Sequence, residues 1–253
     1  MKFFDNLKED YQKVKDKSAK EKWGFFWDYY KIPAICIVLV IVLMVQGIFS
    51  ASNQKDIVFS GVLLNCKVGV EEDAFLDGYY KHAGIDSETQ AAAFYADMML
   101  TKHLGSDKNN NTIQRIIAGI SVQDTDFITG DAYAFQVCAY NSSRIFMDLR
   151  EFLDAETLEK YADRLYYIDD DIIDQINDRD TNLKTLEYPA DPKKPETMKR
   201  PIPVGIDLSD RKDFLDTYYI ASYTDSSPVV YIGVVKNTLR PELTRQFIDY
   251  LLP

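Results

Sequence analysis

The chain has 253 residues, of which 46% are hydrophobic and 13% aromatic, a composition typical of folded proteins and not of disordered ones. Its formal net charge is −11 at pH 7, so it lacks the basic balance that phosphate binding requires, and we expect no nucleic-acid partner. Residues 1–31 contain eight lysines and six acidic residues, a local balance of +2, so residues 32–253 carry −13.

Residues 1–31 are rich in lysine and in aromatic side chains. Apolar residues recur at helical spacing near the start, which predicts either a short amphipathic helix lying on a membrane or a loosely ordered tail: Phe3, Phe4, Leu7, Tyr11 and Val14. Aromatic side chains then cluster at Trp23, Phe25, Phe26, Trp27, Tyr29 and Tyr30. Rings with a polar edge favour the headgroup layer of a bilayer. We interpret this part as a cytoplasmic juxtamembrane segment.

The run from Ile32 to Phe49, IPAICIVLVIVLMVQGIF, contains no charged residue. At ~1.5 Å per residue, a helix of this length just crosses a hydrocarbon core of roughly 30 Å. The run therefore predicts a transmembrane helix over residues 32–49, with Pro33 at its first helical positions, where the missing N–H costs nothing. The alternative is a buried helix of a soluble domain, which is usually shorter and carries a polar stripe.

The lysines predict the orientation of this helix. Eight lysines precede it, whereas only Lys55 and Lys67 follow within about twenty residues. The positive-inside rule thus places the N-terminus in the cytoplasm and residues 50–253 outside the cell, as a single-pass cell-membrane protein. A cleaved signal peptide with a site at Ser50–Ser52 is the alternative, although the region before the apolar run is long for one.

Residues 50–253 alternate between segments typical of strands and of helices. Strands are expected at Asp56–Val68, Asp126–Asp131, Leu165–Ile168, Arg200–Asp210 and Pro228–Asn237. Helices are expected at Glu71–Gly84, Thr112–Ser121, Tyr133–Tyr140, Ala155–Arg164 after a cap at Asp154, Arg211–Ile220 and Pro241–Leu252. The segment Ala91–Leu100 is ambiguous, Gly105–Asn111 is expected to be a loop, and Asp169–Arg200 is expected to be a long loop or a hairpin. The alternation predicts an α/β domain with a sheet that is at least partly parallel.

The cysteines leave two interpretations open. Cys36 lies in the apolar run, and Cys66 and Cys138 lie in the outer domain, where they could form a disulfide in an oxidising compartment or remain buried thiols.

No pattern for catalysis, a cofactor or a metal site is found. The two histidines, His82 and His103, have no metal-ligand spacing, and no nucleophile elbow, phosphate-binding loop or dinucleotide fingerprint is present. We therefore expect a protein that is not an enzyme and that has no catalytic residues, no metal and no cofactor.

Polar residues that follow expected strands are the candidate ligand-binding residues. In open α/β sheets, ligands bind in the crevice beyond the carboxyl ends of the strands. The residues in such positions are Asn65, Asp131, Asp207 and Ser209. Each could equally cap a helix, which is a common role for Asp and Ser.

Four phrases together resemble the extracytoplasmic solute-binding proteins of bacterial ABC transporters: IIAGISVQDTDFITGDAYAF, FMDLREFLD, IPVGIDLSD, and YIGVVKN with the later LTRQFIDYLL. Asp126 and Asp131 match the two aspartates of a "DvixxD" phrase of that family. The resemblance is spread over Asp56–Pro253 and implies a periplasmic-binding-protein-like fold. The layout, with a YYK phrase and a proline before one anchor, is also similar to bacterial membrane proteins of uncharacterised function. Family members commonly have longer chains with two lobes, so a second lobe would be reduced here.

The resemblance implies a membrane-anchored, non-enzymatic binding domain outside the cell, which captures a small molecule and delivers it to a membrane transporter. The alternative is an interaction or accessory subunit of a membrane protein complex, which uses the same fold without a pocket. The implied partners are the lipid bilayer, a small-molecule ligand and a transporter or other membrane protein.

Overall fold

In the computed structural model, residues 15–52, 55–102, 106–219 and 229–253 are described. The chain divides into two units, Met1–Gln54 and Lys55–Pro253, which we describe separately. The expected amphipathic helix over Phe3–Val14 lies outside the described residues.

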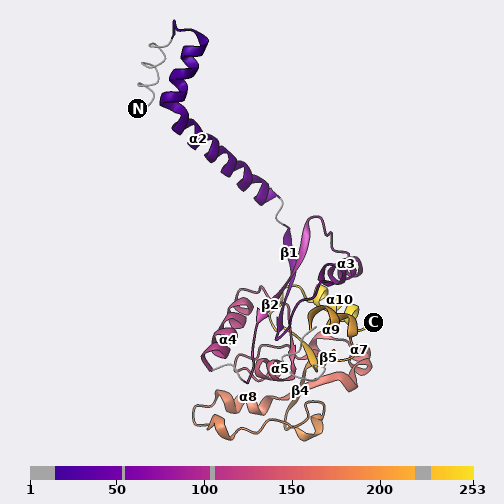
Figure 1. Ribbon diagram of the computed structural model, residues 1–253. Coiled ribbons are helices and arrows are strands. Elements are labelled where there is room, and N and C mark those ends of the chain that lie inside the picture. Colours follow the sequence, from indigo (N-terminus) through magenta and orange to yellow (C-terminus); the bar gives the residue numbers. More distant parts are fainter. Residues whose placement is uncertain (1–14, 53–54, 103–105, 220–228) are drawn as a thin grey trace. The chain divides into compact units, whose positions relative to one another are not determined.

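The first unit contains one long helix, α2 (Ala19–Ser52), drawn in indigo in Figure 1. It begins at a reciprocal cap, in which the Ser18 backbone N–H and hydroxyl donate to the Glu21 carboxylate at 3.0 and 2.7 Å.

The expected start of the apolar helix was wrong. Helix α2 begins well before Pro33, which lies inside it and not in its first turn. The cap at Ser18 starts the helix upstream, and the aromatic cluster continues it: Trp23 stacks on Phe26 and Trp27, and Phe25 contacts Tyr29. A proline removes one backbone hydrogen bond from a helix interior, which such a long helix tolerates.

Helix α2 is long and apolar enough to span a membrane. The spanning candidate is Ala19–Gln46, with a mean hydropathy of 2.1, and it is the one such helix among the described residues. Its aliphatic side chains are exposed, including Ile37, Leu43 and Met44. At ~1.5 Å per residue the whole of α2 is roughly 50 Å long, which exceeds a hydrocarbon core of roughly 30 Å.

The second unit is built on a six-stranded mixed sheet of order β2-β1-β3-β6-β5-β4. The strands are β1 (Asp56–Leu64), β2 (Gln90–Met98), β3 (Phe127–Asp131), β4 (Leu165–Asp169), β5 (Pro201–Asp207) and β6 (Val230–Val234). Strand β1 pairs in parallel with β2 and β3, whereas β6 is antiparallel to both β3 and β5, and β4 is antiparallel to β5. The α/β class and the partly parallel sheet are therefore confirmed. The described part of this unit holds a single sheet, and a periplasmic-binding-protein-like fold is not established by it.

Helices cover both faces of the sheet (Figure 1). Their bounds are α3 (Glu72–Ala83), α4 (Ser106–Ser121), α5 (Ala132–Ala139), α6 (Leu149–Phe152), α7 (Ala155–Lys160), α8 (Asp170–Asn177), α9 (Lys212–Tyr218) and α10 (Pro241–Leu251). Side chains of α3, α9 and α10 pack on one face, and side chains of α4, α5 and α8 pack on the other. Short 3₁₀ turns occur at Ala162–Arg164, Leu183–Thr185 and Pro195–Thr197.

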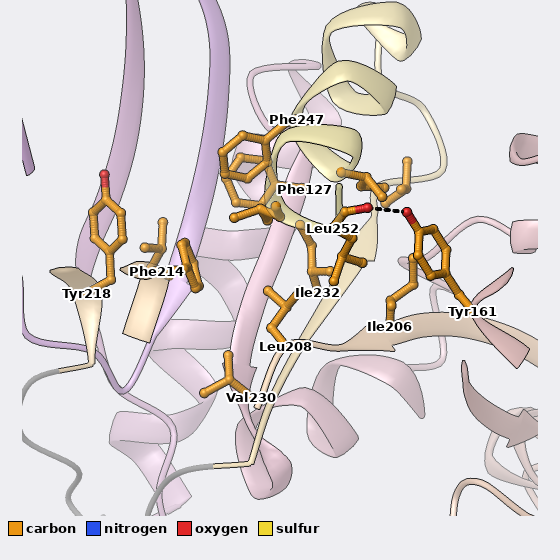
Figure 2. Close-up of a cluster of buried hydrophobic side chains, with 14 of the residues drawn as sticks. Phe127, Tyr161, Ile206, Leu208, Phe214, Tyr218, Val230, Ile232, Phe247 and Leu252 are labelled. Carbon is orange, nitrogen blue, oxygen red and sulfur yellow. Dashed lines mark hydrogen bonds between the residues drawn. The ribbon is translucent and has the colours of Figure 1, made fainter. Parts of the chain in front are cut away.

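The core under α10 is rich in aromatic rings (Figure 2). Phe127 of β3 packs on Phe247 of α10 with ring centroids 4.7 Å apart. A Cβ at Gly61 of β1 would lie 2.1 Å from the Phe127 ring, so the ring occupies the space that glycine leaves open. The C-terminal end is held by the Tyr161 hydroxyl, which donates to the Leu252 carbonyl at 2.5 Å.

A buried carboxylate joins β3 to the segment before α10. Asp126 is fully buried and accepts hydrogen bonds from the Ser60 N–H at 2.8 Å and the Thr238 hydroxyl at 2.6 Å. The Arg240 guanidinium donates to it at 2.8 Å. Asp126, the first aspartate of the "DvixxD"-like phrase, is therefore held by hydrogen bonds within the protein.

Two expected loops contain helices. Helix α4 begins at Ser106 within the segment expected to be a loop, and Asn109 in its first turns bonds the backbone N–H and carbonyl of Thr101. The polar segment after β4 contains α8, which starts after Asp169, whose carboxylate accepts from the Asp171 N–H. The ambiguous segment Ala91–Leu100 forms most of strand β2.

Cys66 and Cys138 are free thiols, and both are buried. Burial raises the pKa of each thiol to about 12. Of the two interpretations from sequence, the structure agrees with buried thiols.

Candidate functional site

Three candidate residues lie at the carboxyl ends of strands β1, β3 and β5. Strands β1, β3 and β5 run in the same direction, because β6 is antiparallel to both β3 and β5. Asn65 follows β1, and Asp131 and Asp207 end β3 and β5. We call Asn65, Asp131, Asp207 and Ser209 the strand-end cluster. The chain order reverses between β1 and β3, which is the position where open α/β sheets bind ligands.

The structure brings Asn65 and Asp131 into contact. The Asn65 amide nitrogen donates to Oδ2 of Asp131 at 2.9 Å. The same amide group also bonds the backbone of Leu100, donating to its carbonyl at 2.6 Å and accepting from its N–H at 2.8 Å. Asn65 is buried and has a left-handed backbone with φ of 56°, which asparagine tolerates better than most residues. Its side chain thus fastens β1 to the chain after β2.

Asp131 has a second contact that is structural. Its Oδ1 accepts a hydrogen bond from the Ala134 N–H at 2.9 Å, so the carboxylate caps α5. The Thr129 hydroxyl nearby bonds the buried hydroxyl of Tyr219 at 3.0 Å. Burial raises the pKa of Tyr219 well above its usual value, so this hydroxyl stays protonated.

Asp207 and Ser209 form a separate pair. Asp207 lies across β6 from Asp131, since the two residues pair with Tyr231 and Val230 of that strand. Its carboxylate accepts from the Ser209 backbone N–H at 2.8 Å and from the Lys193 ammonium at 2.7 Å. Burial acts to raise the pKa of Asp207, but the bonds from Lys193 and Ser209 outweigh it, and the pKa lies below the usual value.

The strand-end cluster is therefore engaged in bonds within the protein. Asn65 and Asp131 join two strands and a helix, and Asp207 holds Lys193. Ligand contact by these four residues stays a prediction. Asp131 has the capping role that the sequence left as the alternative.

A pocket of about 310 Å³ lies near the amino-terminal end of β5, away from the strand-end cluster, on the face of the sheet covered by α5 and α8. It is placed there because Ile202 and Val204 belong to the first half of β5 and Ile168 to the last half of β4. Its apolar wall is made by Ala139, Phe146, Met147, Ile168, Ile173, Ile202 and Val204. Its charged residues are Arg144, Asp148, Glu151, Asp170 and Lys236. Apolar pockets with a few polar groups are the usual form of a small-molecule site.

Two of the charged residues in the pocket neutralise each other. Arg144 donates to Asp170 at 2.9 Å and to Asp174 at 2.5 Å, and these bonds raise the pKa of the guanidinium. Arg200 also bonds both Asp170 and Asp174. The network holds the start of α8 against the turn that carries Arg144, whose φ is 47°.

This pocket was not predictable from the sequence. Its residues come from four separated parts of the chain, and no spacing connects Arg144 with Lys236. The Phe146–Val235 bridge brings these parts together, and Phe146 was visible only as an apolar residue before the FMDLREFLD phrase. The sequence did contain a signal for α8: the spacing of acids and isoleucines in DDIIDQIN gives a helix with one apolar and one charged face.

Among the described residues, no group of three or more histidine, cysteine, aspartate or glutamate side chains is arranged to hold a metal ion. His103 lies outside the described residues. No family model, no curated protein and no solved structure matches this chain.

Proposed function

We propose that this chain is a single-pass membrane protein that presents an α/β solute-binding domain outside the cell. Helix α2 supports the anchor, because its apolar side chains are exposed over a length that exceeds a bilayer core. The aromatic rings around Trp23 and Tyr30 lie at the lysine-rich end of the helix, as expected for a headgroup layer. The lysine excess before the uncharged run Ile32–Phe49 supports a cytoplasmic N-terminus by the positive-inside rule.

The observation that carries the binding function is the pocket between β4, β5 and α8. It combines an apolar wall with charged residues in a volume of about 310 Å³, at the lower end of the range for ligand sites. The domain would capture a small molecule without bond chemistry and pass it to a membrane transporter. The strand-end cluster is proposed as a second, weaker candidate for ligand contact.

A second function is favoured by the single sheet of residues 55–253. Closure of a cleft between two lobes needs a second lobe, and the described residues contain one sheet. An accessory subunit of a membrane complex would use the same anchored domain to contact a membrane protein partner.

A thermal-shift screen of the full chain in lipid nanodiscs tests the binding function. The compounds are amino acids, peptides, sugars, nucleosides and metal ions. A ligand at 100 times its Kd adds about 2.7 kcal/mol to the free energy of unfolding, which raises the Tm by several degrees. A flat screen on folded protein would contradict solute capture for these classes and favour the accessory-subunit function.

A further inference from the structure

We infer that the pocket between β4, β5 and α8 binds an apolar α-amino acid in its zwitterionic form. The inference rests on the proposed solute-binding function and names the class of solute. Four features carry it: an aliphatic wall, a neutralised arginine, and one ammonium and one carboxylate without partners at the mouth.

The wall selects an aliphatic group. Ile168 and Ile173 are buried, as are Val204 of β5 and Phe146, whose ring centroid lies 4.8 Å from that of Phe135. These side chains offer no hydrogen-bond donor or acceptor. A branched aliphatic group would bury apolar area against them.

Most of the charges in the pocket have partners. Arg144 is paired with Asp170 and Asp174. The carboxylate of Asp148 accepts from the backbone N–H and the guanidinium of Arg150, and it begins α6. These contacts leave little capacity for a ligand.

Lys236 and Glu151 remain. Within the part of the chain that the structure describes, the Lys236 ammonium and the Glu151 carboxylate form no ion pair and no hydrogen bond. The pKa of Arg150 is raised mainly by its hydrogen bond to Asp148, and Glu151 adds to this through its charge. Both residues are exposed at the mouth. A ligand with a carboxylate for Lys236 and an ammonium for Glu151 would satisfy both charges.

The balance of charge disfavours other solutes. The pocket contains three acidic residues and two basic ones, and one of the basic residues, Arg144, is neutralised by its ion pair with Asp170. A phosphorylated ligand needs several free cations, and a simple cation would leave Lys236 without a partner. An α-amino acid with an aliphatic side chain meets the wall and both charges.

Isothermal titration calorimetry with L-leucine on the full chain in nanodiscs tests this inference. The variants are Lys236→Gln and Glu151→Gln, and the matched controls are Lys212→Gln and Glu156→Gln, exposed residues outside the pocket. Each pocket variant should weaken leucine binding roughly tenfold or more, since each removes a hydrogen bond between charged groups. The controls should leave the Kd unchanged.

Ligand analogues separate the two charge contacts. Leucinamide lacks the carboxylate, so Lys236→Gln should not weaken its binding further. 4-Methylpentanoate lacks the ammonium, so Glu151→Gln should not weaken its binding further. The conservative Lys236→Arg variant should keep binding, and it provides the test if Lys236→Gln does not fold.

Two results would overturn the inference: no leucine binding by the folded chain, or equal leucine affinity in both pocket variants and the controls. The thermal-shift screen then separates the two proposals. If a solute of another class binds, solute capture stands and the amino-acid class is wrong. If no solute binds, both are wrong.

Discussion

Asp126, which matches the first aspartate of a family-like phrase in sequence, has a structural role in the fold. Its carboxylate is fully buried and accepts hydrogen bonds from Ser60, Thr238 and Arg240. A buried charge is tolerated when it is paired and hydrogen-bonded in this way. The aspartate at the start of a "DvixxD" phrase thus holds β1, β3 and the chain before α10 together.

Removing this charge should destabilise the domain. Asp126→Asn leaves the Arg240 guanidinium facing an amide, and we expect a loss of about 3 kcal/mol in the free energy of unfolding. Urea unfolding of the full chain in nanodiscs, followed by near-UV circular dichroism, measures it. The matched control is Asp97→Asn at the Arg115 pair, which is exposed and should lose less than about 1 kcal/mol. Equal losses in the two variants would contradict a structural role for the buried carboxylate.

The two thiols of the domain should be unreactive. Burial raises the pKa of Cys66 and Cys138 to about 12, so both remain protonated at pH 8, and the thiolate is the reactive form. In native protein, iodoacetamide should modify neither thiol within minutes, and after unfolding in urea it should modify both. Mass spectrometry of tryptic peptides measures this. A peptide containing a Cys66–Cys138 disulfide would show that the thiols are not free.

At the scale of elements, Asp131 connects the end of β3 to the start of α5. The carboxylate caps α5 through Ala134 and accepts from Asn65. The β3–α5 junction was readable from the sequence, because FITGDAYAF places a capping residue between an apolar run and a helix-forming one. Its contact with Asn65 was not readable, since it depends on the parallel pairing of β1 with β3.

Substitution of Asp131 separates the contribution of the helix cap from that of the negative charge. Asp131→Ala should lower the free energy of unfolding by about 1 kcal/mol through loss of the cap, whereas Asp131→Asn should keep most of it, because asparagine also caps helices. Thermal unfolding of both variants gives this comparison. If Asp131→Asn is as destabilising as Asp131→Ala, the charge and not the cap is what the position needs.

Three strands with strong apolar patterns were predictable, whereas the start of α4 and the whole of α8, which have polar sequences, were not. Strands β1, β3 and β6 are β-branched and apolar, and each was located from the sequence. Helix α4 begins in a polar segment with a run of asparagines, which normally indicates a loop. In the structure, the Asn109 side chain bonds the backbone of Thr101, which holds this segment in place as a helix. Helix α8 lies in an acidic segment, and its ion pairs with Arg144 and Arg200 were invisible in sequence.

At the scale of the whole molecule, the chain joins one membrane-length helix to one α/β domain. The helix was predictable from uncharged length alone, although its start was not, because the cap at Ser18 lies far from the apolar run. The alternation of strands and helices predicted the class of the domain, but it could not give the place of β6 between β3 and β5. That antiparallel insertion brings Val235 beside Phe146 and so forms the pocket.

Both proposed functions require a domain held outside the cell by an uncleaved helix, and labelling with a membrane-impermeant maleimide tests this directly. Two single-cysteine reporters, Lys15→Cys and Lys212→Cys, are made in a background in which Cys36, Cys66 and Cys138 are serine. In bacterial spheroplasts, we expect Lys212→Cys to be labelled at once and Lys15→Cys only after permeabilisation, with both on a chain of full length in the membrane fraction. The reverse labelling pattern, or a shortened chain released from the membrane, would contradict the anchored, outward-facing domain.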